Sequence, residues 1–383
     1  MIPRMLEVVL KRYCAKFPIV AVTGPRQSGK TTLLKHQFPE YEYVSLENPD
    51  LRMLAEEDPY GFLGRYDQHV IFDEIQHVPE LFSYLQTKID EDRLMGQYIL
   101  SGSHHFTLME RITQSLAGRV ALFRLLPFQF SELKSVGLME ADYQDVLFQG
   151  FYPPLYDRQL SPDEFFPSYV ETYLERDLRN LMAVKDLSRF RTFLKLCAGR
   201  IGQVLNLHSI AIECGISSPT AKSWLSLLET SFVVFLLPPY YRNFNKRLTK
   251  SPKLYFYDTG LACYLLGIRA AEQVETHFAR GALLENLVVA ELLKQELHAG
   301  KRPEFFYWRE KNGREIDLLM ESPQGLRVWE IKAGATLNPE FFKSFRYLDR
   351  LEGFQAAEKV LVYGGDTPQQ WRDVRVLSWS DIG

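Results

Sequence analysis

The chain has 383 residues, of which 46% are hydrophobic and 24% are charged, a composition typical of folded globular proteins. This length allows two or three domains of roughly 100–200 residues each, and we expect three. The formal net charge of −3 excludes a uniformly basic nucleic-acid coat, so any such binding must come from a local basic surface.

Cysteine spacing and hydropathy predict the compartment. The four cysteines show no C-x-x-C spacing, which favours neither a zinc site nor a disulfide framework and indicates a reducing compartment. No apolar run approaches the roughly 20 residues of a membrane span. Residues 1–17 have the charge distribution of an amphipathic helix and not of a signal peptide. We therefore expect a cytoplasmic protein without a membrane partner.

Residues 19–35 read as an apolar strand, a glycine-rich loop and the start of an apolar helix. The loop fits the pattern G-x-x-x-x-G-K-[ST] in the strand–loop–helix context that this pattern requires. Such a loop turns backbone N–H groups toward phosphates, its lysine reaches the outer phosphates, and its threonine hydroxyl binds Mg²⁺. The alternative is a chance glycine-rich turn. The predicted residues of this nucleoside triphosphate site are Gly24, Pro25, Arg26, Gln27, Ser28, Gly29, Lys30, Thr31 and Thr32.

A second apolar strand, at residues 69–72, ends in Asp73 and Glu74. This is the carboxyl end of the strand, where open parallel sheets place their ligands. We assign Asp73 to Mg²⁺, held directly or through water, and Glu74 to the water that attacks the γ-phosphate. The alternative is a charged strand end that faces solvent.

Two further positions are catalytic candidates. A strand at residues 97–101 ends in Ser101, whose hydroxyl could reach the γ-phosphate or the attacking water, although serine also marks ordinary turns. Arg119 follows a helical segment at residues 107–117 and precedes a strand. From there it could stabilise the transition state in a neighbouring subunit, which predicts a homo-oligomer. The alternative is a surface arginine favoured by the helix dipole.

Five predicted strands alternate with helices, which indicates an α/β core with a parallel sheet and right-handed crossovers. The segments GPRQSGKTT, VSLENPD, VIFDEIQ, ILSGS and LAGRV, followed by LLPFQFSEL, together resemble the AAA+-type P-loop ATPases of bacteria and archaea that carry a winged helix and an uncharacterised carboxyl-terminal domain. The resemblance implies ATP hydrolysis with ATP and Mg²⁺ as cofactors. The five strands are predicted at residues 18–23, 43–46, 69–73, 97–101 and 120–126.

The middle of the chain is predicted to be helical and to contain a winged helix. Residues 209–213 and 219–230 read as two helices joined by a turn, and two strands that would form the wing follow them. Between Tyr240 and Lys253 the wing has no acidic residue, so it is a candidate phosphate-binding surface. The alternative is a lid that packs on the nucleotide or on the next subunit. The predicted DNA contacts are Arg242, Lys246, Arg247, Lys250 and Lys253.

The carboxyl-terminal third carries four charged residues that could converge. Glu285 lies on the apolar face of a predicted helix at residues 281–297, where a buried carboxylate needs a cation or a metal beside it. A predicted hairpin and the strand after it carry Asp317, Glu330 and Lys332, the last two on one face. Asp317 and Glu330 are the predicted metal ligands, and the lysine would orient the nucleophile or stabilise developing charge.

These four residues resemble the PD-(D/E)XK nuclease fold, with Asp317 and the Glu330-x-Lys332 pair in its motif and Glu285 on the helix ahead of them. The resemblance implies DNA cleavage that depends on a second divalent metal, Mg²⁺ or Mn²⁺, with all four as catalytic residues. The alternative is a degenerate nuclease fold kept as a structural or binding module.

The sequence thus predicts three domains: a parallel-sheet P-loop ATPase core at residues 1–160, a helical winged-helix domain at 161–268 and a nuclease-like α/β domain at 269–383. The first functional hypothesis is ATP hydrolysis coupled to the binding or remodelling of structured or double-stranded DNA. The second is an ATP-driven regulatory or signalling switch whose last two domains bind protein and whose nuclease-like fold is inactive.

Overall fold

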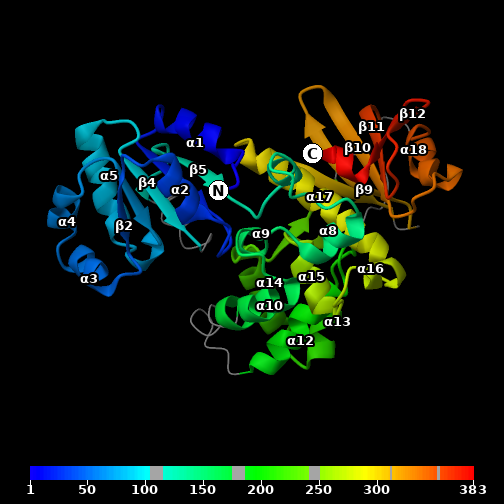
Figure 1. Ribbon diagram of the computed structural model, residues 1–383, viewed down its shortest axis with the longest axis horizontal. Coiled ribbons are helices and arrows are strands. Elements are labelled where there is room, and N and C mark those ends of the chain that lie inside the picture. Colours follow the sequence, from blue (N-terminus) through cyan, green and yellow to red (C-terminus); the bar gives the residue numbers. More distant parts are fainter. Residues whose placement is uncertain (104–114, 175–185, 241–250, 311–312, 352–353) are drawn as a thin grey trace. The chain divides into compact units, whose positions relative to one another are not determined.

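The computed structural model describes two compact units (Figure 1). The first comprises Met1–Phe128, Thr230–Phe232 and Leu297–Lys301, and the second comprises the rest of the chain. None of the helices in the described ranges is long and apolar enough to cross a membrane. The described residues are 1–103, 115–174, 186–240, 251–310, 313–351 and 354–383.

The first unit is built around a five-stranded parallel sheet in the order β2-β3-β4-β1-β5, drawn in blue and cyan in Figure 1. The predicted parallel α/β core is therefore confirmed. The strands are β1 (Ile19–Thr23), β2 (Glu42–Ser45), β3 (Val70–Asp73), β4 (Tyr98–Gly102) and β5 (Val120–Arg124), and the helices are α1 (Leu6–Cys14), α2 (Lys30–Gln37), α3 (Pro49–Glu57), α4 (Pro59–Arg65) and α5 (Leu81–Asp92).

Strand β1 is buried on both faces, as expected for an interior strand of a parallel sheet. Ile19 and Ala21 pack in a cluster with residues of α3, α4 and α5, whereas Val20 and Val22 pack in a second cluster with residues of α1 and α2. This alternation follows from the two-residue period of a strand. The loop that leaves the carboxyl end of β1 is therefore fixed by a rigid core.

The helices after the first unit belong to the second one. Residues 129–160 fall in the first predicted domain, yet they pack with α15. For example, the backbone N–H of Phe151 donates to Asp258 at 2.7 Å, and Asp258 caps α15. The three-domain division stays a prediction. The helices here are α7 (Phe130–Lys134), α8 (Tyr143–Gln149), α9 (Pro153–Asp157), α10 (Pro162–Tyr169), α12 (Leu187–Ala198), α13 (Leu207–Cys214), α14 (Ser218–Thr230), α15 (Thr259–Leu266) and α16 (Glu272–Thr276).

A two-stranded antiparallel sheet follows α14, made of β6 (Val234–Leu237) and β7 (Lys253–Phe256). Helix α13 ends at Gly215, whose φ of 64° lies in the left-handed region that favours glycine. The order of two helices and a strand pair matches the elements expected from the sequence, and the assignment as a winged helix stays a prediction. Residues 241–250, between the two strands, lie outside the described residues.

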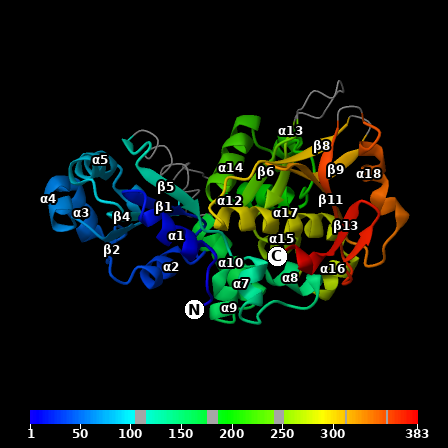
Figure 2. The same ribbon diagram turned by 90° about the horizontal axis from the view of Figure 1, so that it is seen from above.

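The carboxyl-terminal part contains a six-stranded mixed sheet in the order β12-β13-β11-β10-β9-β8. Strand β9 pairs antiparallel with β8 and β10, whereas β11 pairs parallel with β10 and β13. Helix α17 lies on one side of these strands and α18 on the other (Figure 2). The elements are α17 (Arg280–His298), β8 (Phe305–Arg309), β9 (Glu315–Ser322), β10 (Gly325–Lys332), α18 (Lys343–Leu348), β11 (Ala356–Tyr363), β12 (Gln369–Trp371) and β13 (Val374–Ser378).

Candidate functional site

The glycine-rich loop, residues 24–31, joins β1 to α2 and requires both of its motif glycines. A Cβ atom on Gly24 would lie 2.1 Å from the backbone carbonyl oxygen of Leu125, so no larger residue fits there. Gly29 caps α2 with a φ of 91°, a conformation that glycine adopts without a steric penalty. The loop therefore curls tightly in front of the first turn of α2, where backbone N–H groups favour an anion.

Lys30 begins α2, and its side chain folds back over this loop. The ammonium Nζ donates to the carbonyl oxygens of Gly24 and Pro25, both at 2.9 Å. The side chain is buried, and this desolvation lowers the pKa of Lys30, whereas the nearby carboxylates of Glu74 and Asp73 raise it. A cation and a curled backbone thus lie together, an arrangement that fits the phosphates of a nucleotide.

Asp73 ends β3 and is held by three hydroxyl groups. Thr31 Oγ1 and Tyr43 OH each donate to Oδ2 at 2.7 Å, and Ser101 Oγ donates to Oδ1. Burial and the hydrogen bond to Asp73 raise the pKa of Tyr43, so the phenol remains a donor. The contact between a P-loop threonine and an aspartate at a strand end is the arrangement that holds Mg²⁺ in P-loop enzymes. These residues therefore fit the ion.

Glu74 follows with a strained backbone. Its φ of 54° and ψ of 42° lie in the left-handed region, which a non-glycine residue occupies at a cost of about 1–3 kcal/mol, mostly at functional sites. Oε2 accepts hydrogen bonds from the Ser103 backbone N–H at 3.2 Å, from Ser103 Oγ at 3.0 Å and from Gln76 Nε2. The strained turn and these three donors fix the direction of the carboxylate.

The sheet order explains why serines of β4 reach both acidic residues. Because β4 lies between β1 and β3, its carboxyl end stands between the glycine-rich loop and Asp73. Ser101 is fully buried there, and its hydroxyl holds the Asp73 carboxylate. Its predicted contact with a phosphate or with the attacking water stays a prediction.

Two residues of this site lie outside the sequence motifs. Tyr43 reaches Asp73 because β2 pairs with β3, a register that sequence alone does not give. Arg4, before α1, donates to the carbonyl oxygens of Ser28 at 2.8 Å and of Leu126 at 2.6 Å. Arg4 is buried, so its hydrogen bond to Ser28 stabilises the loop from the protein interior.

Arg119 lies far from the glycine-rich loop of its own chain. Strands β1 and β5 run parallel with Ile19 opposite Val120, so Arg119 stands at the amino end of the sheet. Its Nε and Nη2 pair with the two carboxylate oxygens of Asp90 at 2.7 and 2.8 Å, on the surface. The contact with a neighbouring subunit's nucleotide and the homo-oligomer stay predictions. Residues 107–114 of the predicted preceding helix lie outside the described residues.

A second group of charges surrounds Glu285 of α17. Lys253 Nζ donates to Glu285 Oε1 at 2.9 Å and also pairs with Glu315, while Tyr255 OH donates to Glu285 Oε1 at 2.5 Å. One carboxylate oxygen from each of Glu285, Glu315 and Asp317 lies within 4.8 Å of the others. Oxygen ligands of this kind suit Mg²⁺ or Mn²⁺. Sequence reasoning missed Glu315.

Glu330 and Lys332 of β10 adjoin this group. Lys332 Nζ donates to Glu330 Oε1 at 2.7 Å and lies 3.6 Å from Asp317 Oδ2, and Ser344 Oγ also donates to Glu330 Oε1, at 2.9 Å. Burial, together with the nearby Asp317 carboxylate, raises the pKa of Glu330 to about 8. Structure thus brings the four predicted charges into one neighbourhood. We name Glu285, Glu315, Asp317 and Glu330 the acidic centre.

One predicted DNA contact differs from its expected placement. Lys253 is fully buried and paired with Glu285 and Glu315, because β7 directs its side chain inward, so it offers no phosphate contact on the surface. The other four predicted contacts lie outside the described residues; they are Arg242, Lys246, Arg247 and Lys250.

Three family models match consecutive parts of the chain. A model described as an AAA domain matches residues 16–134. Two models described as domains of unknown function, DUF8612 and DUF4143, match residues 140–272 and 280–382.

Two mycobacterial proteins are similar over nearly the whole chain. Uncharacterized protein Mb2031c of Mycobacterium bovis and uncharacterized protein Rv2008c of Mycobacterium tuberculosis are each 32% identical over 364 residues, covering 93% of this chain and 79% of each relative. Among solved structures, the Walker-type ATPase PABY2304 of Pyrococcus abyssi is 15% identical, with 68% of this chain and 94% of that chain covered and a TM-score of 0.44. AMPPCP-bound DnaA from Aquifex aeolicus is 16% identical, with 58% and 85% covered and a TM-score of 0.30.

Proposed function

We propose, for a chain that belongs to the same family as the two mycobacterial proteins and carries an AAA-type P-loop ATPase domain, that ATP turnover is coupled to the binding or remodelling of double-stranded or structured DNA. One observation carries the DNA part. The chain between β6 and β7, residues 241–250, contains four cations and no carboxylate, in a protein of net negative charge. Such a one-signed segment suits the phosphates of a duplex.

We assign nucleotide binding and ATP hydrolysis to different residues of the ATPase domain. Lys30 and the loop N–H groups would hold the phosphates, and Thr31 with Asp73 would hold Mg²⁺, which neutralises phosphate charge when bound. Glu74, oriented by Ser103 and Gln76, would accept a hydrogen bond from the attacking water and polarise it. Substitution of a single residue should therefore affect either nucleotide binding or hydrolysis.

An electrophoretic shift of duplex, forked and junction DNA tests the DNA part. Wild-type protein is expected to retard the DNA, and the Lys246→Ala/Arg247→Ala/Lys250→Ala variant is expected to bind at least tenfold more weakly, because three phosphate contacts are lost. A matched control removes three exposed cations elsewhere, Arg158, Arg302 and Arg375. The proposal would be contradicted if the wild-type protein does not bind DNA, or if the two triple variants bind DNA with equal affinity.

A second candidate function has one observation in its favour. Lys253 places an ammonium among the carboxylates of the acidic centre, where a metal would otherwise supply the positive charge. An internally neutralised centre suits an ATP-driven switch whose nuclease-like part is inactive and binds protein. The DNA-cleaving alternative requires instead that the centre take a divalent ion beside Lys253.

Thermal unfolding of the nucleotide-free full chain with Mn²⁺ separates these alternatives. If the acidic centre binds the ion, stability should rise, by about 2.7 kcal/mol at a hundredfold excess over the dissociation constant. Asp317→Asn should abolish the gain, whereas the exposed control Asp366→Asn should keep it. Unchanged melting across Mn²⁺ concentrations would favour the inactive centre. If the centre also cleaves, wild-type protein should nick DNA and Lys332→Ala should not.

A further inference from the structure

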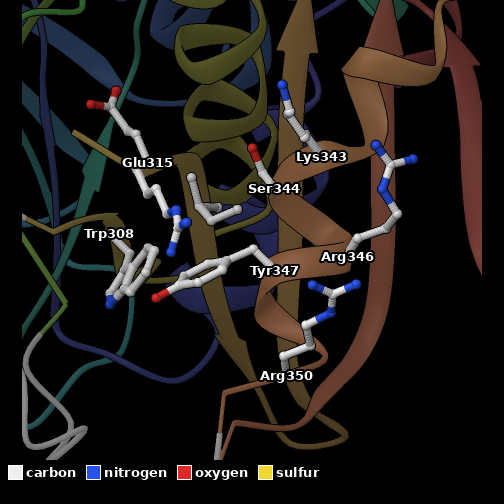
Figure 3. Close-up of a pocket in the computed structure, with 9 residues that line it drawn as sticks. Trp308, Glu315, Lys343, Ser344, Arg346, Tyr347 and Arg350 are labelled. Carbon is white, nitrogen blue, oxygen red and sulfur yellow. The ribbon is translucent and has the colours of Figure 1, made fainter. Parts of the chain in front are cut away.

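A cationic pocket lies between β8, β9 and α18, with a volume of about 370 Å³ (Figure 3). Tyr347 points from α18 toward Trp308 of β8, and Glu315 of β9 borders the pocket opposite the helix. The cations that line it are Arg314, Lys343, Arg346 and Arg350. Four cations and one carboxylate therefore line the pocket; Glu315 pairs with Lys253 and Arg309, and Lys343 pairs with Glu340.

The cations of α18 lie on one side of the helix. Lys343, Arg346 and Arg350 are spaced by three and four residues, which places them along one face of α18 and the turn after it. Arg346 and Arg350 are exposed, and neither pairs with a carboxylate of the described residues within 4 Å. Arg314 stacks on the ring of Tyr347, with its guanidinium carbon 4.0 Å from the ring centre. Two guanidinium groups thus remain for an anionic ligand.

The pocket borders the acidic centre through one shared residue and one hydrogen bond. Glu315 lines the pocket and belongs to the acidic centre. Ser344 also lines it, and its hydroxyl donates to Glu330 Oε1 at 2.9 Å. The pocket therefore lies directly beside the acidic centre, and Glu315 is the carboxylate that the two share.

The combination of cations with the partly exposed ring of Tyr347 indicates the class of ligand. Proteins that hold single strands combine a basic groove for the backbone with aromatic side chains for the bases. The volume lies at the lower end of the about 300–1,000 Å³ of small-molecule sites, which suits one nucleotide unit inside the pocket. Bare inorganic phosphate would leave the half-buried ring of Tyr347 unused; Trp308 also lines the pocket, but it is almost fully buried.

We propose that this pocket binds one phosphorylated nucleotide unit, with its phosphate on Arg346 and Arg350 and its base or sugar beside the half-buried ring of Tyr347. If the unit belongs to a DNA strand, which rests on the proposed function, the neighbouring unit of the strand lies beside Ser344 and Glu315. A free nucleotide offers the same chemistry. The pocket is thus a strand-end or single-strand subsite beside the acidic centre, separate from the glycine-rich loop.

Fluorescence anisotropy with a 12-nucleotide, 5′-phosphorylated single strand tests the proposal. The full chain carries Lys30→Ala, which removes nucleotide binding at the glycine-rich loop, and the buffer contains EDTA. Adding Arg346→Ala and Arg350→Ala should weaken strand binding at least tenfold. It should also flatten the plot of log affinity against log salt by roughly 0.7 per lost phosphate contact. Adding Arg302→Ala and Arg375→Ala, which remove the same charge elsewhere, should change affinity less than twofold.

Competition by free deoxyadenosine monophosphate separates the two sources. If the monophosphate binds with the same dependence on Arg346 and Arg350 and the strand gains nothing over it, the pocket takes a free nucleotide. That outcome would support the pocket whether or not duplex DNA is shifted. Equal strand and nucleotide binding by the two double variants, or no binding of either probe, would overturn the inference. If strand binding is unchanged by Arg346→Ala and Arg350→Ala but lost in the Lys246→Ala/Arg247→Ala/Lys250→Ala variant, the inference is overturned and the proposed function stands.

Discussion

Glu74→Gln protein is expected to bind ATP with nearly wild-type affinity and to hydrolyse it at least about a hundredfold more slowly, the usual worth of a positioned general base. Glutamine keeps the size of the side chain and can still hydrogen-bond Ser103, so the strained turn at the end of β3 should persist. It cannot polarise the attacking water as a carboxylate does. Phosphate release at saturating ATP measures the loss.

Lys30→Ala provides the contrast to Glu74→Gln. Removing the ammonium that rests on the carbonyl oxygens of Gly24 and Pro25 leaves those groups without their donor and removes the main cation of the phosphate site. Binding of a fluorescent ATP analogue should then be lost. Equal loss of nucleotide binding in both variants would show that Glu74 acts on the resting nucleotide and not on water.

Lys253→Ala is expected to destabilise the second unit by about 3–5 kcal/mol, because it leaves the largely buried Glu285 carboxylate without its cation and Glu315 with Arg309 alone. Urea unfolding followed by tryptophan fluorescence should show a lower midpoint for this unit. Lys343→Ala, which breaks an exposed pair with Glu340, should stay within about 0.5 kcal/mol of wild type.

A double variant makes the Lys253 result specific. If the loss comes from uncompensated carboxylates, Glu285→Gln combined with Lys253→Ala should be less destabilising than the sum of the single substitutions, since the two residues are in contact. Additive losses, or a wild-type midpoint for Lys253→Ala, would show that the buried pair carries little of the stability.

The parts that sequence predicts well are local. The glycine-rich loop, the strand that ends in Asp73 and the parallel core depend on spacings within single segments, and the core is confirmed. Tyr43 and Arg4 were not predicted, since their contacts depend on strand register and on chain segments that meet only in the fold. A contact between residues that are far apart in the chain leaves no periodic pattern in the sequence.

The acidic centre also contains contacts that the sequence pattern did not predict. Alternation along β9 singled out Asp317 but left Glu315 aside, although the carboxylates meet in space. Lys253 was grouped with the wing cations because it is close to them in sequence, yet strand β7 turns it into the interior. A cation's neighbours in sequence therefore say little about its partners once a strand fixes which way it points.

Coupling between ATP hydrolysis and DNA is tested most directly by steady-state phosphate release with and without forked DNA. Wild-type protein is expected to hydrolyse ATP several-fold faster with DNA, and the stimulation should fall as salt rises, because it depends on phosphate contacts. The Lys246→Ala/Arg247→Ala/Lys250→Ala variant should keep its basal rate and lose the stimulation. A wild-type rate that is the same with and without duplex, forked and junction DNA would contradict the account.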